Sequence, residues 1–140
     1  MKLIANIISI FTFWSYAIIA QPSYLMNLSS PQIVDDKTIE FDVNIESTGP
    51  DFILTSYQCA FNIDSIFIND TTFCFEYIHS TSALSNAPLY GVGCDKVDGI
   101  RKIHFASSAG IDSITTHPLR VGRFMIKKSS SLKIDSLQIK

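Results

Sequence analysis

The segment "KTIEFDVNIES" (residues 37–47) alternates apolar and polar residues without a break, and this alternation constrains the fold more than any other feature. A period of two is typical of a β-strand that buries one face and leaves the other in solvent. The sequence therefore predicts a half-buried antiparallel strand over residues 37–46. Its inward-facing residues are expected to be Ile39, Phe41, Val43 and Ile45.

Short alternating runs of the same kind recur through the rest of the chain, separated by turn residues such as "TGPD" and "KVDG". No segment keeps a period of 3.6 residues for three turns. Many short strands with Gly/Pro turns and no helix predict an all-β fold, either a β-sandwich or a barrel. Of these two we expect an antiparallel, jelly-roll-like β-sandwich. The expected strand-forming runs are 52–63, 71–80, 89–95, 100–108 and a closing pair within 119–140.

The first twenty residues, "MKLIANIISIFTFWSYAIIA", have one Lys, then an apolar run, then small residues. This order is typical of a secretory signal peptide. We expect cleavage between Ala20 and Gln21, which leaves residues 21–140 as a single exported domain. The alternative is an uncleaved membrane anchor, but four polar residues interrupt the apolar run. The predicted location is secreted, extracellular or at the cell surface, without membrane association once the leader is removed.

The charge of the mature segment argues against a nucleic-acid partner. The chain has eleven Lys and Arg, of which Lys2 lies in the leader, so ten remain against thirteen Asp and Glu, a balance of −3. Nucleic-acid-binding domains usually carry a basic surface instead.

Three cysteines, Cys59, Cys74 and Cys94, remain in a chain predicted to meet an oxidising environment. Their spacings fit no zinc site. Cys59 is in phase with inward-facing aromatic residues, so buried core thiols are one interpretation. The other is a Cys74–Cys94 disulfide.

Three stretches together resemble a known architecture: "IEFDVNIESTGPDFILTSYQCAFNID", "RKIHFASSAG" and "LRVGRFMIKKSSSLKIDSLQIK". They are similar to the cohesin-like domains, which are allied in fold to the family 2 and 3 carbohydrate-binding modules. The likeness spans roughly Tyr24 to Lys140. Such domains occur in large secreted bacterial proteins that often end in a sorting domain for type IX secretion. The resemblance implies that residues 21–140 are the N-terminal module of a longer protein.

The resemblance also implies a non-catalytic binding or scaffolding role, in adhesion or in pairing with a protein partner. The alternatives are a carbohydrate-binding module and a structural spacer. Exposed aromatic rings stack on sugars, and Tyr90 in "PLYGVG" is the best candidate, although it could instead cover the core. The acidic row that includes Glu40 and Asp42 could meet a basic protein surface, or could be an ordinary solvated face.

Catalysis and metal binding have weaker support. The histidines, His79, His104 and His117, fall in separate segments, and no "G-x-S-x-G" elbow accompanies them. The sequence therefore predicts no enzyme and no cofactor. A structural calcium ion is a minor alternative, because oxygen-rich turns favour calcium. Its candidate ligands are Asp64, Asp70, Asp95 and Asp98.

Overall fold

A computed structural model describes residues 21–63, 73–98 and 100–129 of the 140-residue chain. Within these ranges the chain forms nine strands and no helix. The prediction of an all-β fold is confirmed. The strands are β1 (Tyr24–Ile33), β2 (Thr38–Ser47), β3 (Phe52–Leu54), β4 (Gln58–Ile63), β5 (Phe73–Ile78), β6 (Tyr90–Val97), β7 (Ile100–Ala106), β8 (Asp112–Ile114) and β9 (Leu119–Lys128).

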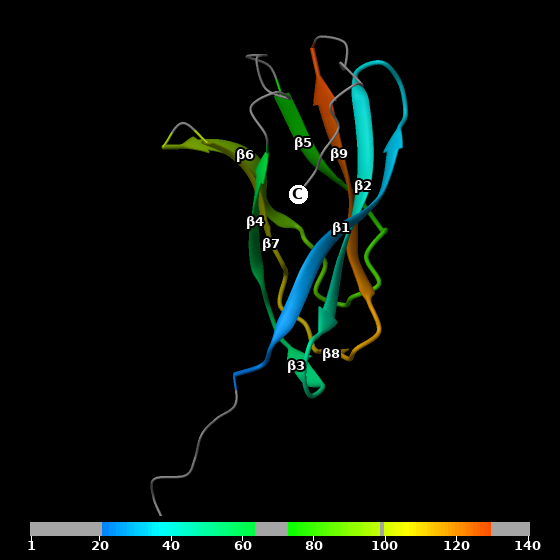
Figure 1. The fold of residues 1–140 in the computed structure, drawn as a ribbon, viewed down its shortest axis with the longest axis vertical. Coiled ribbons are helices and arrows are strands. Elements are labelled where there is room, and N and C mark those ends of the chain that lie inside the picture. The colour runs from blue at the N-terminus through cyan, green and yellow to red at the C-terminus, as the bar shows by residue number, and fades with distance from the viewer. Residues whose placement is uncertain (1–20, 64–72, 99, 130–140) are drawn as a thin grey trace, which may run out of the picture.

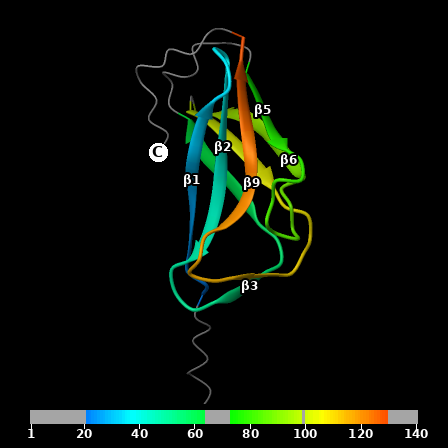
Figure 2. The ribbon, with the colours of Figure 1, turned by 90° about the vertical axis from the view of Figure 1, so that its right-hand side faces the viewer.

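Two sheets face each other, as Figures 1 and 2 show from perpendicular directions. The larger has the order β1-β2-β9-β5 and the smaller β4-β7-β6. A short pair, β3-β8, lies at one end of the sandwich (Figure 1). Every strand pairing is antiparallel. This arrangement is a β-sandwich, whose core lies between the inner faces of the sheets.

The core follows from the alternation in β2 and β9. The inward residues of β2, predicted from its period of two, are all at most 1% exposed. Phe124 of β9 lies opposite Phe41 of β2 in register, and its ring also stacks on Phe75 of β5 at a centroid distance of 5.2 Å. Phe105 of the smaller sheet stacks on Phe124 at 4.5 Å. This aromatic stack joins the two sheets at the centre of the molecule.

Two parts of the sequence fold differently from the prediction. The run 52–63 is split into β3 and β4, so Ile53 is 59% exposed, whereas Tyr57, which is in phase with it in the sequence, is buried. The strand β1 was not predicted, because Pro31 and a weak apolar pattern hide it. Its register with β2 shifts between Ser29 and Gln32, which accommodates the proline at a bulge.

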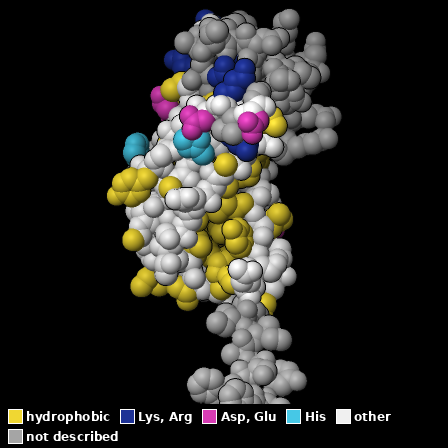
Figure 3. Space-filling view, turned by 90° about the vertical axis from the view of Figure 1, so that its left-hand side faces the viewer, with side chains coloured by type: hydrophobic (Ala, Val, Ile, Leu, Met, Phe, Trp, Pro, Cys, Tyr) yellow, Lys and Arg dark blue, Asp and Glu magenta, His cyan; other side chains and the backbone are white. Residues whose placement is uncertain are grey.

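Several large apolar side chains remain exposed on the described surface. Seen from the side of the β4-β7-β6 sheet, apolar side chains gather in a strip along the lower half of the molecule (Figure 3). The exposed large apolar residues are Tyr24, Leu25, Ile33, Val34, Ile53, Leu89, Tyr90, Ile100 and Ile111.

Candidate functional site

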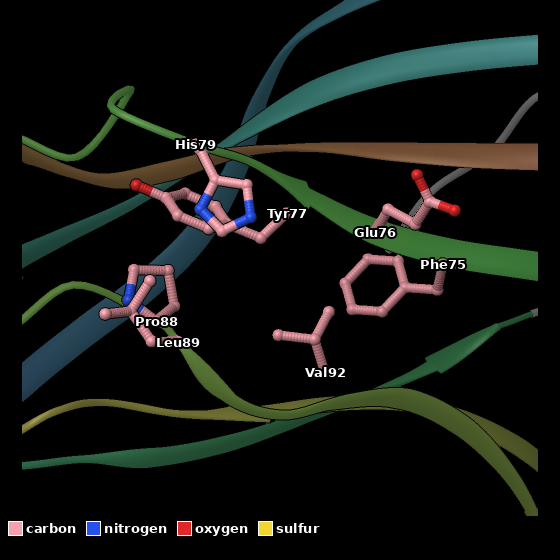
Figure 4. A pocket seen from close by; sticks show the side chains of 7 residues that line it. All are labelled: Phe75, Glu76, Tyr77, His79, Pro88, Leu89 and Val92. Carbon is pink, nitrogen blue, oxygen red and sulfur yellow. The ribbon is translucent and has the colours of Figure 1, made fainter.

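A groove of about 320 Å³ runs between β5, the edge of the larger sheet, and the segment that leads into β6, the edge of the smaller sheet. Its volume is in the range of small ligand sites, which are mostly apolar with a few polar groups. The groove is lined by Phe75, Glu76, Tyr77, His79, Pro88, Leu89 and Val92 (Figure 4).

The alternation of β5 forms one wall of this groove. Phe75 and Tyr77 are buried and point toward the Pro88–Val92 segment, whereas the carboxylate of Glu76 points away from it (Figure 4). Glu76 accepts a hydrogen bond from the thiol of Cys74 at 2.8 Å on the outer face of β5. This β5 wall, with Phe75 and Tyr77, is the floor of the groove and is aromatic. The carboxylate of Glu76 lies at the rim of the groove.

His79 supplies the second polar group. Its ring lies edge-on to Tyr77 at a centroid distance of 5.4 Å, and its side chain is exposed. The hydroxyl of Tyr77 accepts a hydrogen bond from the backbone N–H of Ser82 at 3.2 Å. A ligand in the groove would thus meet an apolar surface with an imidazole at one side.

The opposite wall is held by hydrogen bonds to Asp112 of β8. Its carboxylate accepts from the backbone N–H of Ser85 at 2.8 Å, from the Ser85 hydroxyl at 3.0 Å and from the N–H of Asn86 at 3.1 Å. Asn86 is fully buried. These bonds fix the segment before Pro88, so the groove is formed without a ligand. The sequence indicated only a Ser/Asn/Pro loop here, and the distant carboxylate that orders it could not be identified.

Tyr90 directly follows the groove-lining Leu89 and is 61% exposed. Of the two alternatives drawn from the sequence, the structure therefore gives the exposed ring and not a residue that covers the core. The next residue, Gly91, has a φ of 55°, a conformation that favours glycine, and the β6–β7 register shifts between Tyr90 and Gly93. This bulge turns the start of β6 out of the regular sheet.

His104 lies on the outer face of β7, where its alternation with Ile103 and Phe105 placed it, but it is engaged by two groups of β6. Its Nδ1 is 2.7 Å from the carbonyl oxygen of Gly91, and its Nε2 is 2.9 Å from Oδ2 of Asp95. Gly93 leaves the room for this ring, since a Cβ there would lie 3.3 Å from its Cε1. His104 thus supports the bulge that presents Tyr90.

Glu40 and Asp42, the two acidic residues of β2 considered for a protein partner, are neutralised within the larger sheet. Arg123 of β9 donates from Nε to Glu40 at 2.8 Å and from Nη1 to Asp42 at 3.1 Å, and these hydrogen bonds raise the pKa of its guanidinium. Its third nitrogen donates to Gln32 at 2.9 Å. The two carboxylates are mostly buried, so they are not the free acidic surface that one interpretation of the sequence offered to a basic partner.

The Cys74–Cys94 disulfide, one of the two interpretations of the sequence, is not formed in the structure, in which Cys59, Cys74 and Cys94 are free thiols. The alternation of β5 accounts for the separation of these two thiols. Cys74 is exposed on the outer face, next to the buried Phe75, whereas Cys94 packs against the core. A disulfide requires the two Cβ atoms to face each other within about 4 Å. Burial raises the pKa of the Cys59 thiol to about 11, which fits a core position.

Among the described residues, no group of three or more His, Cys, Asp or Glu side chains is arranged to hold a metal ion. Of the four aspartates considered for calcium, Asp95 contacts His104 and Asp98 is in a turn with a φ of 51°. Asp64 and Asp70 lie outside the described residues.

The predicted leader and Ala20 also lie outside the described residues, and Gln21 is the first residue inside them. In the described part of the chain, no helix has the length and apolar character that crossing a membrane requires. Comparison with known protein families, with characterised proteins and with solved structures finds no match to this chain.

Proposed function

We propose that this chain is a non-catalytic binding module of an exported protein, and that it engages a protein partner through the groove between β5 and β6. The observation that carries this proposal is the groove itself, an aromatic and aliphatic floor with polar groups at its rim. Export rests on the predicted signal peptide, and a scaffolding or adhesive role agrees with the resemblance to cohesin-like domains. The partner, like the module, would then be extracellular.

The edge of β5 suggests how a partner would bind. In the described residues β5 pairs only with β9, so no described strand pairs with its other edge, which lies beside the groove. An extended segment can add to such an edge through main-chain hydrogen bonds, while alternate side chains enter the adjoining pockets. Phe75 and Tyr77 form an apolar floor for those side chains. The proposed ligand is therefore an extended peptide with alternating apolar residues.

Selection from a library of random extended peptides, followed by fluorescence anisotropy, tests this proposal. Leu89→Asp places a charge in the groove and is expected to weaken binding of the selected peptides about tenfold or more. Leu25→Asp on β1 is the matched control, because Leu25 is 46% exposed and Leu89 49% exposed. Peptides that bind both variants equally, or a failure to select any peptide, would contradict the proposal.

Carbohydrate binding is the second candidate, and the exposure of Tyr90 favours it. An accessible aromatic ring can stack on the apolar face of a sugar ring, and the groove beside it offers His79 to sugar hydroxyls. On a glycan array this candidate predicts binding that Tyr90→Ala weakens about tenfold or more, while Tyr24→Ala leaves it unchanged. Tyr24 is a suitable control because it is 54% exposed but lies on β1. A module without glycan or peptide binding would be a structural spacer.

A further inference from the structure

The rim of the groove carries one carboxylate. Glu76 is the only Asp, Glu, Lys or Arg among the residues that line the groove, and its side chain is exposed. It accepts a hydrogen bond from the thiol of Cys74, which carries no charge. Among the described residues, no Lys, Arg or His forms an ion pair with it. A ligand in the groove therefore meets a carboxylate that has no cationic partner in this part of the chain.

The register of β5 explains why no cation faces Glu76. On the outer face of the larger sheet, Glu76 lies opposite the uncharged Met125 of β9. Lys127 lies opposite Cys74 instead, two residues away, and Arg123 is held by the carboxylates of β2. On its other side, β5 pairs with no described strand. Opposite charges on adjacent strands attract, so a cation would be stabilised on this second side of Glu76.

The alternation of an added strand determines which of its residues meets Glu76, and this step rests on the proposed binding of an extended peptide along β5. Peptide residues opposite Phe75 and Tyr77 would point inward to the apolar floor, and the residue between them would point outward beside Glu76. We propose that the groove selects an extended segment with the pattern apolar–basic–apolar, whose Lys or Arg pairs with the Glu76 carboxylate. Residues that face each other on adjacent strands have Cβ atoms about 5 Å apart, within reach of either cation.

The charge of the whole module favours the same ligand. Without Lys2 of the predicted leader, the chain has ten Lys and Arg against thirteen Asp and Glu, so it attracts a basic segment and repels an acidic one. The imidazole of His79 lies toward the other end of the groove from Glu76 (Figure 4). The preference at the outward position beside Phe75 and Tyr77 is therefore determined by Glu76.

Three peptide libraries test this proposal. They share random apolar residues at alternate positions and differ only in the central outward residue, which is Lys, Gln or Glu. At about 0.01 M salt, capture on the full chain is expected to enrich Lys peptides about three- to tenfold over Glu peptides, because opposite charges attract and like charges repel. At about 1 M salt, where the Debye length falls to about 3 Å, the preference should shrink below about twofold.

Substitutions at Glu76 assign the preference to its carboxylate. Glu76→Gln is expected to abolish the preference for Lys over Glu, and Glu76→Lys to reverse it. Both variants should keep the fold because the side chain is exposed, and circular dichroism checks this. Glu46→Gln is the matched control, since it removes the same charge from β2, which β9 separates from β5, and should keep the preference. Bound peptide should also slow the alkylation of Cys74, an exposed thiol on the same face of β5.

Two results would overturn this inference and leave the proposed function standing. One is equal capture of Lys and Glu peptides, and the other is a preference for Lys that persists in Glu76→Gln. Two further results would overturn the proposed function as well. They are the failure of all three libraries to yield a binding peptide, and binding that leaves the alkylation of Cys74 unchanged, which would place the peptides away from the edge of β5.

Discussion

The two long seams of the sandwich differ in how the chain closes them. At the β5/β6 seam the two edge strands approach each other, Phe75 and Tyr77 are buried, and a fixed segment forms a groove. At the other seam, between the edge strands β1 and β4, the inward residues of β4 are only partly buried. Among the described residues, the same two-layer core therefore has one side where two edge strands meet and form a groove, and another side where the edge strand β4 is less completely buried.

Chain connectivity explains the difference. β5 and β6 follow each other in the sequence, so their connecting segment must cross from one sheet to the other at this seam, where Asp112 fixes it. β1 and β4 are separated by β2 and β3, and no connection between them crosses their seam directly.

The comparison predicts different costs for removing two neighbouring aromatic rings. Phe105 and Phe61 lie on paired strands of the smaller sheet with ring centroids 6.4 Å apart. Phe105→Ala is expected to lower the free energy of unfolding by about 3–5 kcal/mol, because it opens a cavity at the centre of the core. Phe61→Ala is expected to cost about 1–2 kcal/mol, because its ring is already partly in solvent. Urea unfolding followed by circular dichroism measures both.

Phe105→Leu provides a folded reference if Phe105→Ala does not fold, and is again expected to cost more than Phe61→Ala. Equal costs at the two positions would show that the β4 side is as well covered as the centre.

A second prediction concerns the fixed wall of the groove. A Cβ on Gly110 would lie 2.7 Å from the Cβ of Asn86 and 2.8 Å from its backbone nitrogen. Gly110→Ala is therefore expected to displace this segment and to lower the free energy of unfolding by about 1–3 kcal/mol. The measurement is again urea unfolding, with exchange of residues 81–89 as a local readout.

Gly49→Ala is the matched control, since the nearest atom to its Cβ would be the Cβ of Ser23 at 3.9 Å. Its effect should stay within about 0.5 kcal/mol. If Gly110→Ala lowers the free energy of unfolding equally little, the segment around Asn86 can move at little cost. The difference between the two seams of the sandwich is then smaller than the geometry indicates.

The features that could be predicted from the sequence are those with a local cause. A period of two is a local property, so β2 and its buried face were predicted correctly. The pairing of Arg123 with Glu40 and Asp42 was not, because it depends on the register between strands about 80 residues apart. The two acidic residues could be recognised in the sequence, but Arg123 could not be identified as their partner.

The groove was missed for a related reason. Its floor comes from the predicted strand at residues 71–80, but its other wall comes from a segment classified as a loop, which Asp112 orders from a distance of 26 residues or more in sequence. Only Tyr90 was identified beforehand, because its place between a loop and Gly91 marks an exposed position. The sequence therefore indicated a residue next to the groove but not the residues that line it.

The smallest predicted effect uses Cys59 as a probe of the seam between β1 and β4. Burial raises the pKa of its thiol to about 11, whereas an unfolded thiol ionises near 9. Above pH 9 the unfolded state therefore binds fewer protons than the folded state, so the free energy of unfolding falls as the pH rises through the window from 9 to 11. We expect this thiol to account for about 1–2 kcal/mol of the loss, because it is only partly buried.

The Cys59→Ala variant isolates this contribution, which matters because burial also raises the pKa of Tyr57. The difference in pH dependence between the two proteins should appear in urea unfolding at pH 8, 9, 10 and 11. Thiol labelling at pH 8 gives an independent reading. Cys74 is exposed and should react first, even though its hydrogen bond to Glu76 raises the pKa of its thiol. Cys59, whose burial raises its pKa to about 11, should react more slowly. Comparable labelling rates would mean that the seam between β1 and β4 opens readily to solvent.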